Sequence, residues 1–194
     1  MKVVMQRPLI FYVGVAFAFV TVFLLAVLLP RPEPRPCCGC TGCSCVLVVI
    51  AGIVATVFVH EGLHVVAARA VGVRGLRVRL EPRMGSLLLD YDWMTPLQYV
   101  IVALAPQVLS VVLLILLVVA RDYSLLLWPS LVVNVAGGVP DMLNAIYFGL
   151  VHGDARRFWL LYDERGRVVG GVVEYPDKLV VYDMVYGRYA RSGS

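Results

Sequence analysis

The run Val59-His60-Glu61-Gly62-Leu63-His64-Val65 contains residue types at a spacing that suits metal chemistry. If the run is helical, His60 and His64 lie one turn apart on the same face, so both imidazoles can bind one metal ion. Glu61 projects beside them and is suitably placed to take a proton from metal-bound water. Zinc lowers the pKa of bound water from about 15.7 to about 7. The pattern therefore indicates a hydrolytic zinc site, with Glu61 as the catalytic base.

A third metal ligand is expected, because catalytic zinc sites generally use three protein ligands and one open position. Apart from Glu61, Asp141 is the only carboxylate within the long apolar runs. His60 lies nine residues before Arg69, and Asp141 lies eleven residues before His152. At 1.5 Å per helical residue, both lie roughly 13–17 Å from the same membrane face. The sequence thus predicts zinc bound by His60, His64 and Asp141.

Asn134 is a candidate substrate-binding residue. It lies seven residues before Asp141, near the same face of a continuous helix. Its amide is expected either to hydrogen-bond a substrate carbonyl or to bridge two helices. Asn144 and Gln107 present the same two alternatives.

The helix around Asp141 is predicted to be irregular. Gly137, Gly138 and Pro140 directly precede it. Proline removes a backbone hydrogen bond, which is tolerated inside a membrane only where protein or a water-filled cavity satisfies the freed group. A broken helix would suit a site that must admit water. The alternative is a kink that serves packing, with small residues at a helix contact.

The composition is that of a membrane protein, with 60% hydrophobic and 15% charged residues. A typical soluble domain has about 25% charged residues. Each long apolar run provides the ~20 residues that a spanning helix needs. The predicted fold is an all-α membrane bundle of about four transmembrane helices, with the first retained rather than cleaved as a signal peptide. The predicted spans are Leu9–Leu29, Val46–Ala68, Leu97–Ala120 and Leu125–Leu150.

Ionisable residues inside these spans strengthen the metal hypothesis. Each costs roughly 2.5–3.5 kcal/mol at the middle of a spanning helix, so such residues tend to be functional. Away from the span ends they are His60, Glu61, His64 and Asp141. The alternative is a set of buried polar residues that only link helices.

The basic residues indicate topology rather than a nucleic-acid partner. Short cytoplasmic loops of membrane proteins collect Lys and Arg. Of the 17 basic residues, only Arg31, Arg35 and Arg121 fall in outer segments if the N-terminus is inside. We therefore expect a multi-pass protein of the cell membrane with both termini in the cytoplasm.

Two segments outside the spans have strand-like patterns. Residues Val73–Leu80 alternate in polarity, and Ser86–Tyr91 can pair back on them, so a cytoplasmic β-hairpin is expected. After residue 152, Val- and Tyr-rich runs separated by turn residues predict a small three-strand meander. The expected domains are a membrane domain of residues 1–152 and a cytoplasmic β-rich tail of residues 153–194.

The chain resembles the site-2 protease family of intramembrane metalloproteases. The resemblance rests on His60–His64, on Ala68–Val73 with its strand-like loop, and on Asn134 with Asp141. Val139-Pro140-Asp141-Met142 departs from the Asn-x-x-Pro and Leu-Asp-Gly patterns of that family. In this, and in Ala105-Pro106, the chain is closer to a set of small zincin-peptidase membrane proteins. The resemblance implies zinc on His60, His64 and Asp141, Glu61 as base, and hydrolysis of peptide bonds in or near the membrane.

Other functions remain open from the sequence. A non-proteolytic zinc-binding membrane protein and a metal transporter or sensor are the alternatives to a metallopeptidase. The five cysteines between Cys37 and Cys45 are compatible with local disulfides, a metal or redox cluster, or lipidation. A peptide or transmembrane-protein substrate is implied by the resemblance, whereas the oligomeric state leaves no mark in the sequence.

Overall fold

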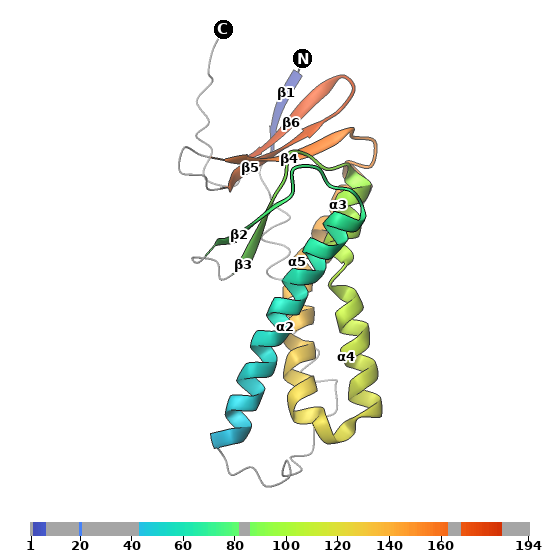
Figure 1. The fold of residues 1–194 in the computed structure, drawn as a ribbon. Helices are drawn as coiled ribbons and strands as arrows, with labels where there is room; N and C mark the ends of the chain where they lie inside the picture. Colours follow the sequence, from blue (N-terminus) through green and yellow to red (C-terminus); the bar gives the residue numbers. More distant parts are fainter. Residues whose placement is uncertain (1, 7–19, 21–42, 82–85, 163–167, 184–194) are drawn as a thin grey trace.

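The computed structural model describes residues 2–6, 20, 43–81, 86–162 and 168–183. The predicted span Leu9–Leu29 lies outside the described residues except for Val20, and so do Cys37, Cys38 and Cys40. The helices form a long bundle, and the strands gather at one end of it, which we call the sheet end (Figure 1). The elements in chain order are β1 (Lys2–Gln6), α2 (Cys43–Ala70), β2 (Arg77–Glu81), β3 (Ser86–Asp90), α3 (Pro96–Leu104), α4 (Gln107–Val119), the 3-10 turn η1 (Arg121–Tyr123), α5 (Ser124–Val151), β4 (Arg157–Tyr162), β5 (Val168–Glu174) and β6 (Lys178–Asp183).

Within the described residues, three helical stretches are long and apolar enough to cross a membrane. They are Val46–Ala70, Pro96–Val119 and Arg121–Val151, which coincide with the last three predicted spans. Large apolar side chains point outward from them: Phe58 is 66% exposed and Val108 is 62% exposed. Apolar surface on this scale is suited to a lipid environment. These helices support the prediction, made from the composition, that the chain is a membrane protein.

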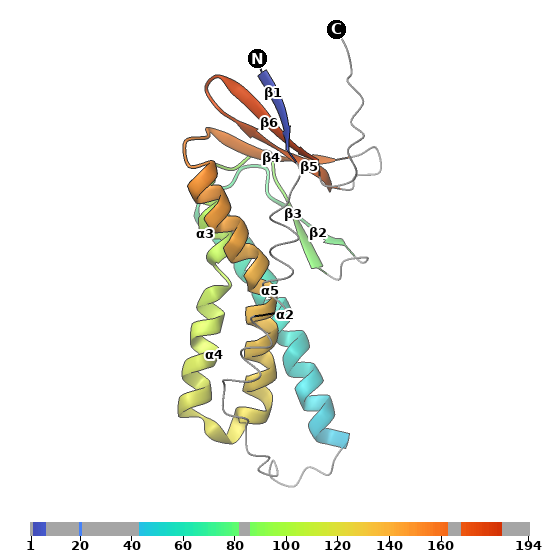
Figure 2. The same cartoon turned by 180° about the vertical axis from the view of Figure 1, so that it is seen from behind.

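Helix α5 is the centre of the bundle. It contacts α2, α3 and α4. It runs toward the sheet end in the same direction as α2, whereas α3 and α4 run away from that end (Figures 1 and 2). Gly52 lets α2 approach it closely, because a Cβ there would lie 2.1 Å from Cδ1 of Leu126. The two helices that carry the predicted metal ligands, α2 and α5, therefore run in the same direction.

The break in a helix occurs at Pro106, not at Pro140. Helix α5 continues through Pro140 to Val151, so the predicted broken helix was wrong, whereas the alternative of small residues at a helix contact agrees with the positions of Gly137 and Gly138. The third predicted span is instead divided into α3 and α4. Neighbouring side chains pack against the turn before Pro140: a Cβ on Gly137 would lie 3.6 Å from the His60 ring, and one on Gly138 would overlap Gln107. Gly137 and Gly138 thus allow α2 and α4 to approach α5 closely at this turn.

The predicted β-hairpin is present as β2 and β3. The two strands pair antiparallel, from Arg77 opposite Asp90 to Glu81 opposite Ser86. Helix α2 ends in a Schellman motif, in which Val73 N–H donates to the Ala68 carbonyl at 3.0 Å. Gly72 takes the positive φ of 72° that this motif needs. The chain is thereby turned out of the bundle toward the hairpin.

The C-terminal strands form the predicted meander, joined by a strand that was not predicted. The order in the sheet is β1-β6-β5-β4, and the pairs β4–β5 and β5–β6 are antiparallel. Strand β1 pairs parallel to β6, from Lys2 opposite Lys178 to Gln6 opposite Tyr182. The first strand of the chain therefore lies beside the last at the sheet end (Figure 1). This sheet includes residues from both sides of the predicted domain boundary at residue 152.

The sheet is fixed to the end of α5 by a buried aromatic cluster. Phe148, Phe158 and Tyr175 pack together with Met94 and Val173 in this core. In addition, Phe158 N–H donates to the Met94 carbonyl at 2.7 Å, so β4 is bonded to the segment that leads into α3. The sheet therefore contacts two of the helices.

His152 lies in the middle of this contact. It is 2% exposed, and its ring nitrogens hydrogen-bond the hydroxyls of Tyr175 and Tyr182. The Tyr182 hydroxyl also lies 3.1 Å from that of Tyr147. Burial lowers the pKa of His152 below its ordinary value of 6.5, an effect that Asp154 opposes and Lys178 reinforces. The docked sheet thus favours the neutral imidazole.

This lowered pKa predicts a loss of stability in acid. The unfolded chain binds a proton at His152 more readily, so the stabilising contribution is complete above about pH 6.5 and declines as the pH falls below it. Thermal unfolding of detergent-purified protein between pH 8 and pH 5 checks this, with His152→Gln as the control that cannot titrate. The difference in stability between the two proteins should shrink toward pH 5, and a difference that is constant with pH would contradict the assignment.

Candidate metal centre

His60 and His64 lie on one face of α2, as the motif predicts. Their ring centroids are 5.1 Å apart. Only 9% of the His60 side chain and 12% of the His64 side chain are exposed. Two imidazoles buried this deeply among apolar helices need polar partners.

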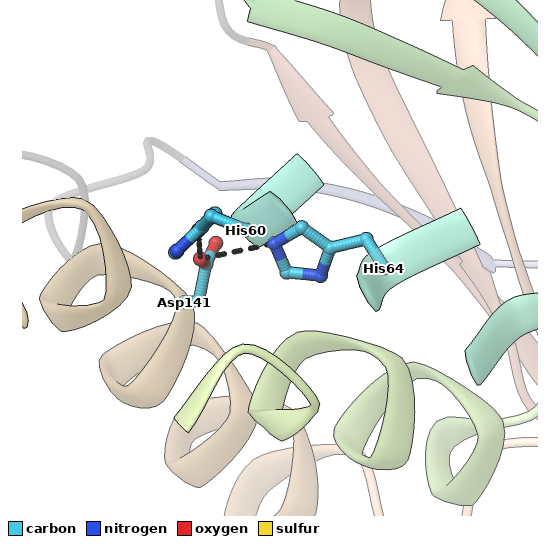
Figure 3. Close-up of side chains that lie close together, drawn as sticks. All are labelled: His60, His64 and Asp141. Atoms are coloured by element: carbon cyan, nitrogen blue, oxygen red, sulfur yellow. Dashed lines mark ion pairs between the residues drawn. The ribbon is translucent and has the colours of Figure 1, made fainter. Parts of the chain in front are cut away.

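Asp141 of α5 faces both histidines. Its Oδ2 atom lies 3.4 Å from Nε2 of His60 and 3.3 Å from Nε2 of His64 (Figure 3). One ligand atom from each of the three residues lies within 4.8 Å of the others. The three ligands predicted from the sequence are therefore brought together.

The spacing of these atoms fits zinc. A tetrahedral zinc ion with nitrogen and oxygen ligands at about 2.0–2.1 Å places neighbouring ligand atoms about 3.3–3.4 Å apart. Both distances to the Asp141 oxygen match this edge. Two imidazoles and a carboxylate are also a donor set that zinc accepts. The residues present therefore fit a three-ligand zinc site.

Asn134 bonds the far side of the His60 ring. Its Oδ1 lies 3.0 Å from Nδ1 of His60. Its Nδ2 donates to the Pro106 carbonyl at 3.2 Å and to Oγ of Ser110 at 2.7 Å. Because both amide hydrogens point at oxygens, the amide oxygen faces His60, and Nδ1 of His60 must donate to it. Asn134 is 1% exposed, so its contacts favour the helix-bridging alternative that the sequence left open.

The His64 ring is held by a backbone carbonyl. Its Nδ1 lies 2.8 Å from the carbonyl oxygen of Val102 in α3. A carbonyl only accepts, so Nδ1 carries the hydrogen and Nε2 is left with its lone pair toward Asp141. The sequence motif carried no signal for this partner, because it is a main-chain atom.

Three further predicted polar residues lie around the centre. Glu61 follows His60 in α2 and is half-buried. Gln107 opens α4, where its Oε1 accepts from Ser110 at 3.2 Å, and Nε2 is buried without a hydrogen-bond partner among the described residues. Asn144 lies about one turn beyond Asp141 in α5 and is half-buried. Ser110 was not singled out by its sequence context, and it joins Gln107 to Asn134.

One protein family matches this part of the chain. The family described as "putative zincin peptidase" matches residues 53–151, just over half of the chain. The chain belongs to this zincin peptidase family. Zincins are metallopeptidases that use zinc, so membership agrees with the donor set and spacing of His60, His64 and Asp141. Comparison with the curated proteins and with the solved structures gives no match.

The zinc content of this zincin-family protein tests the three predicted ligands separately. Detergent-purified wild type, stripped with a chelator and reloaded, should hold about one zinc per chain by elemental analysis. His64→Ala and Asp141→Ala should each lose it, because two ligands do not complete the site. His152→Gln is the matched control, since it removes a buried histidine outside the centre and should keep the zinc. Zinc retained in Asp141→Ala would show that the carboxylate is not a ligand.

Proposed function

We propose that this zincin-family protein is an intramembrane zinc peptidase that hydrolyses peptide bonds of membrane-embedded or membrane-associated substrates. The observation that carries the proposal is the set of three ligand atoms at zinc spacing, next to Glu61, within helices apolar enough to span a membrane. A site that served only structure would have no use for an adjacent base.

The depth of the centre supports action within the membrane. His60 lies ten residues before the end of α2 at Ala70, and Asp141 lies ten residues before the end of α5 at Val151. At 1.5 Å per residue, both lie about 15 Å from the sheet end of their helices. That is about half of the ~30 Å hydrocarbon thickness of a bilayer.

The chemistry follows from the groups present. Bound zinc would polarise the scissile carbonyl and make a water molecule acidic at neutral pH. Glu61 takes a proton from that water as its oxygen bonds to the carbonyl carbon, and then delivers the proton to the amide nitrogen as the C–N bond breaks. One water is consumed, and the products are a carboxylate and an amine.

A helical substrate must be unwound before it can be cut, because its carbonyls are engaged within the helix. We infer that the β2–β3 hairpin holds the unwound segment. The hairpin is two-stranded, and β3 contacts α2, the helix that carries both histidines. An extended peptide can pair with the edge of such a hairpin through main-chain hydrogen bonds.

The charges support a topology with both termini in the cytoplasm of a multi-pass cell-membrane protein. Exposed Arg69, Arg74 and Arg157 lie at the sheet end, whereas Arg121 lies at the opposite end. The guanidinium groups of Arg74 and Arg157 lie 5.8 Å and 4.9 Å from the Trp93 ring. Tryptophan and basic residues beside helix ends are typical of a membrane interface, with Lys and Arg concentrated on the cytoplasmic side.

Glu61→Gln separates catalysis from zinc binding. The glutamine amide cannot accept the proton, so cleavage should fall by about 10²–10⁴-fold while the zinc content stays at the wild-type level. Both proteins are incorporated into bacterial membrane vesicles, and new N-termini of membrane proteins are identified by mass spectrometry.

Chelated wild type, with and without added zinc, serves as the control for this cleavage. Equal cleavage by Glu61→Gln and wild type would contradict the role of the base. Bound zinc without zinc-dependent cleavage would favour a non-proteolytic zinc-binding protein, and zinc uptake into liposomes independent of Glu61 would favour a transporter.

A further inference from the structure

Both histidines of the proposed metal centre donate from Nδ1 to acceptors that depend on one short region, the break between α3 and α4: His64 directly, and His60 through Asn134 of α5. His64 Nδ1 meets the carbonyl of Val102, the third-last residue of α3. His60 Nδ1 meets Asn134, which is itself anchored on the carbonyl of Pro106. The two imidazoles come from one helix, and both are oriented from the same place on another.

Pro106 explains why the Val102 carbonyl is available. In an uninterrupted helix, the N–H of residue 106 would donate to the carbonyl of residue 102. Proline has no N–H, and its ring displaces the carbonyl four residues earlier. Ala105 N–H reaches the Val102 oxygen only at 3.3 Å, in a tighter turn. The oxygen is left free to accept from His64 at 2.8 Å.

The same break exposes an acceptor for Asn134. The Pro106 carbonyl accepts from Leu109 N–H at 3.0 Å and from Asn134 Nδ2 at 3.2 Å. Ser110 adds an acceptor at 2.7 Å from the same Nδ2 atom. With both hydrogens engaged on α4, the Asn134 amide cannot flip, and its oxygen stays directed at His60.

We propose that the Ala105–Pro106 break is a positioning device for the metal centre, with Pro106 and Asn134 as positioning residues. It fixes His60 and His64 with hydrogen on Nδ1, so that both Nε2 atoms are turned toward Asp141 as metal ligands. The inference rests on the proposed zinc site but concerns the orientation of its ligands rather than catalysis. Partners of this kind, bonded to the second nitrogen of a histidine ligand, typically change metal affinity by about 10–100-fold when they are removed.

Four substitutions test the device. Pro106→Ala restores an N–H that competes for the Val102 carbonyl and favours a straight helix, so it should weaken zinc binding by about 10–100-fold through His64. Asn134→Leu removes the acceptor for His60 and should weaken binding to a similar extent. Asn134→Asp keeps an acceptor for His60 but loses the donors to the Pro106 carbonyl and to Ser110, so it should restore the affinity only in part. Pro129→Ala is the matched control, because it removes a proline within α5 without touching the break.

Two measurements on the detergent-purified chain distinguish positioning from general packing. Zinc affinity is measured by competition with a chromophoric chelator. The hydrogen position on each imidazole is measured by ¹⁵N NMR with labelled histidine, which is tractable because the chain has only 3 histidines. Pro106→Ala should shift the His64 signals toward a mixture of tautomers, and Asn134→Leu should do so for His60, with His152 unchanged in both.

The outcomes separate this inference from the proposed function. Wild type that binds one zinc, with Pro106→Ala and Asn134→Leu matching Pro129→Ala in affinity and tautomer, would overturn the positioning role and leave the zinc site standing. An affinity of Asn134→Asp no higher than that of Asn134→Leu would also contradict it, because packing rather than the acceptor for His60 would then be the cause. Wild type without zinc would overturn both proposals.

Discussion

The missing N–H of Pro106 is the constraint on which the arrangement of the polar centre depends. Among apolar helices, every buried polar group must find its partner within the protein. The missing N–H leaves the Val102 carbonyl available to His64, and the Pro106 carbonyl at the same break also accepts from Asn134. Asn134 in turn bonds His60. The break in one helix is therefore matched by side chains of two others: His64, a predicted ligand, and Asn134, the partner of His60.

Much of the centre could be predicted, because its signals are either local residue spacing or the presence of a charged residue type that apolar segments normally exclude. The spacing of His60 and His64 follows from helical periodicity, and Asp141 is conspicuous because carboxylates are rare in apolar runs. The β2–β3 hairpin and the C-terminal meander follow from alternation and turn residues. Each of these inferences needs only neighbouring residues or the polarity of a segment.

The remaining features depend on contacts between distant segments. Pro106 and Pro140 obey the same local rule, but the helix is interrupted at Pro106 and continues through Pro140, a difference that the residues beside each proline do not predict. The partner of His64 is a main-chain oxygen, and a main-chain oxygen cannot be recognised from the residue types in a sequence. Strand β1 has five residues and depends on a partner near the other end of the chain.

The family match ends at the same residue as helix α5, directly before the C-terminal strands. The matched residues 53–151 contain all three candidate ligands, Glu61, Asn134 and Pro106, and they end where α5 ends. Strands β1 and β4–β6 lie outside the match. The sheet is thus joined to the family's helical part through His152 and the aromatic residues around it, directly after the last matched residue.

The parallel pairing of β1 with β6 has a consequence for the order of assembly during synthesis. Residues 2–6 leave the ribosome before all of the described helices, whereas their partner, residues 178–183, follows after them. Pairing over so large a sequence separation requires a long loop to close, which makes it a slow step compared with helix formation. The helices, including α5 with Asp141, therefore have time to associate before the sheet closes.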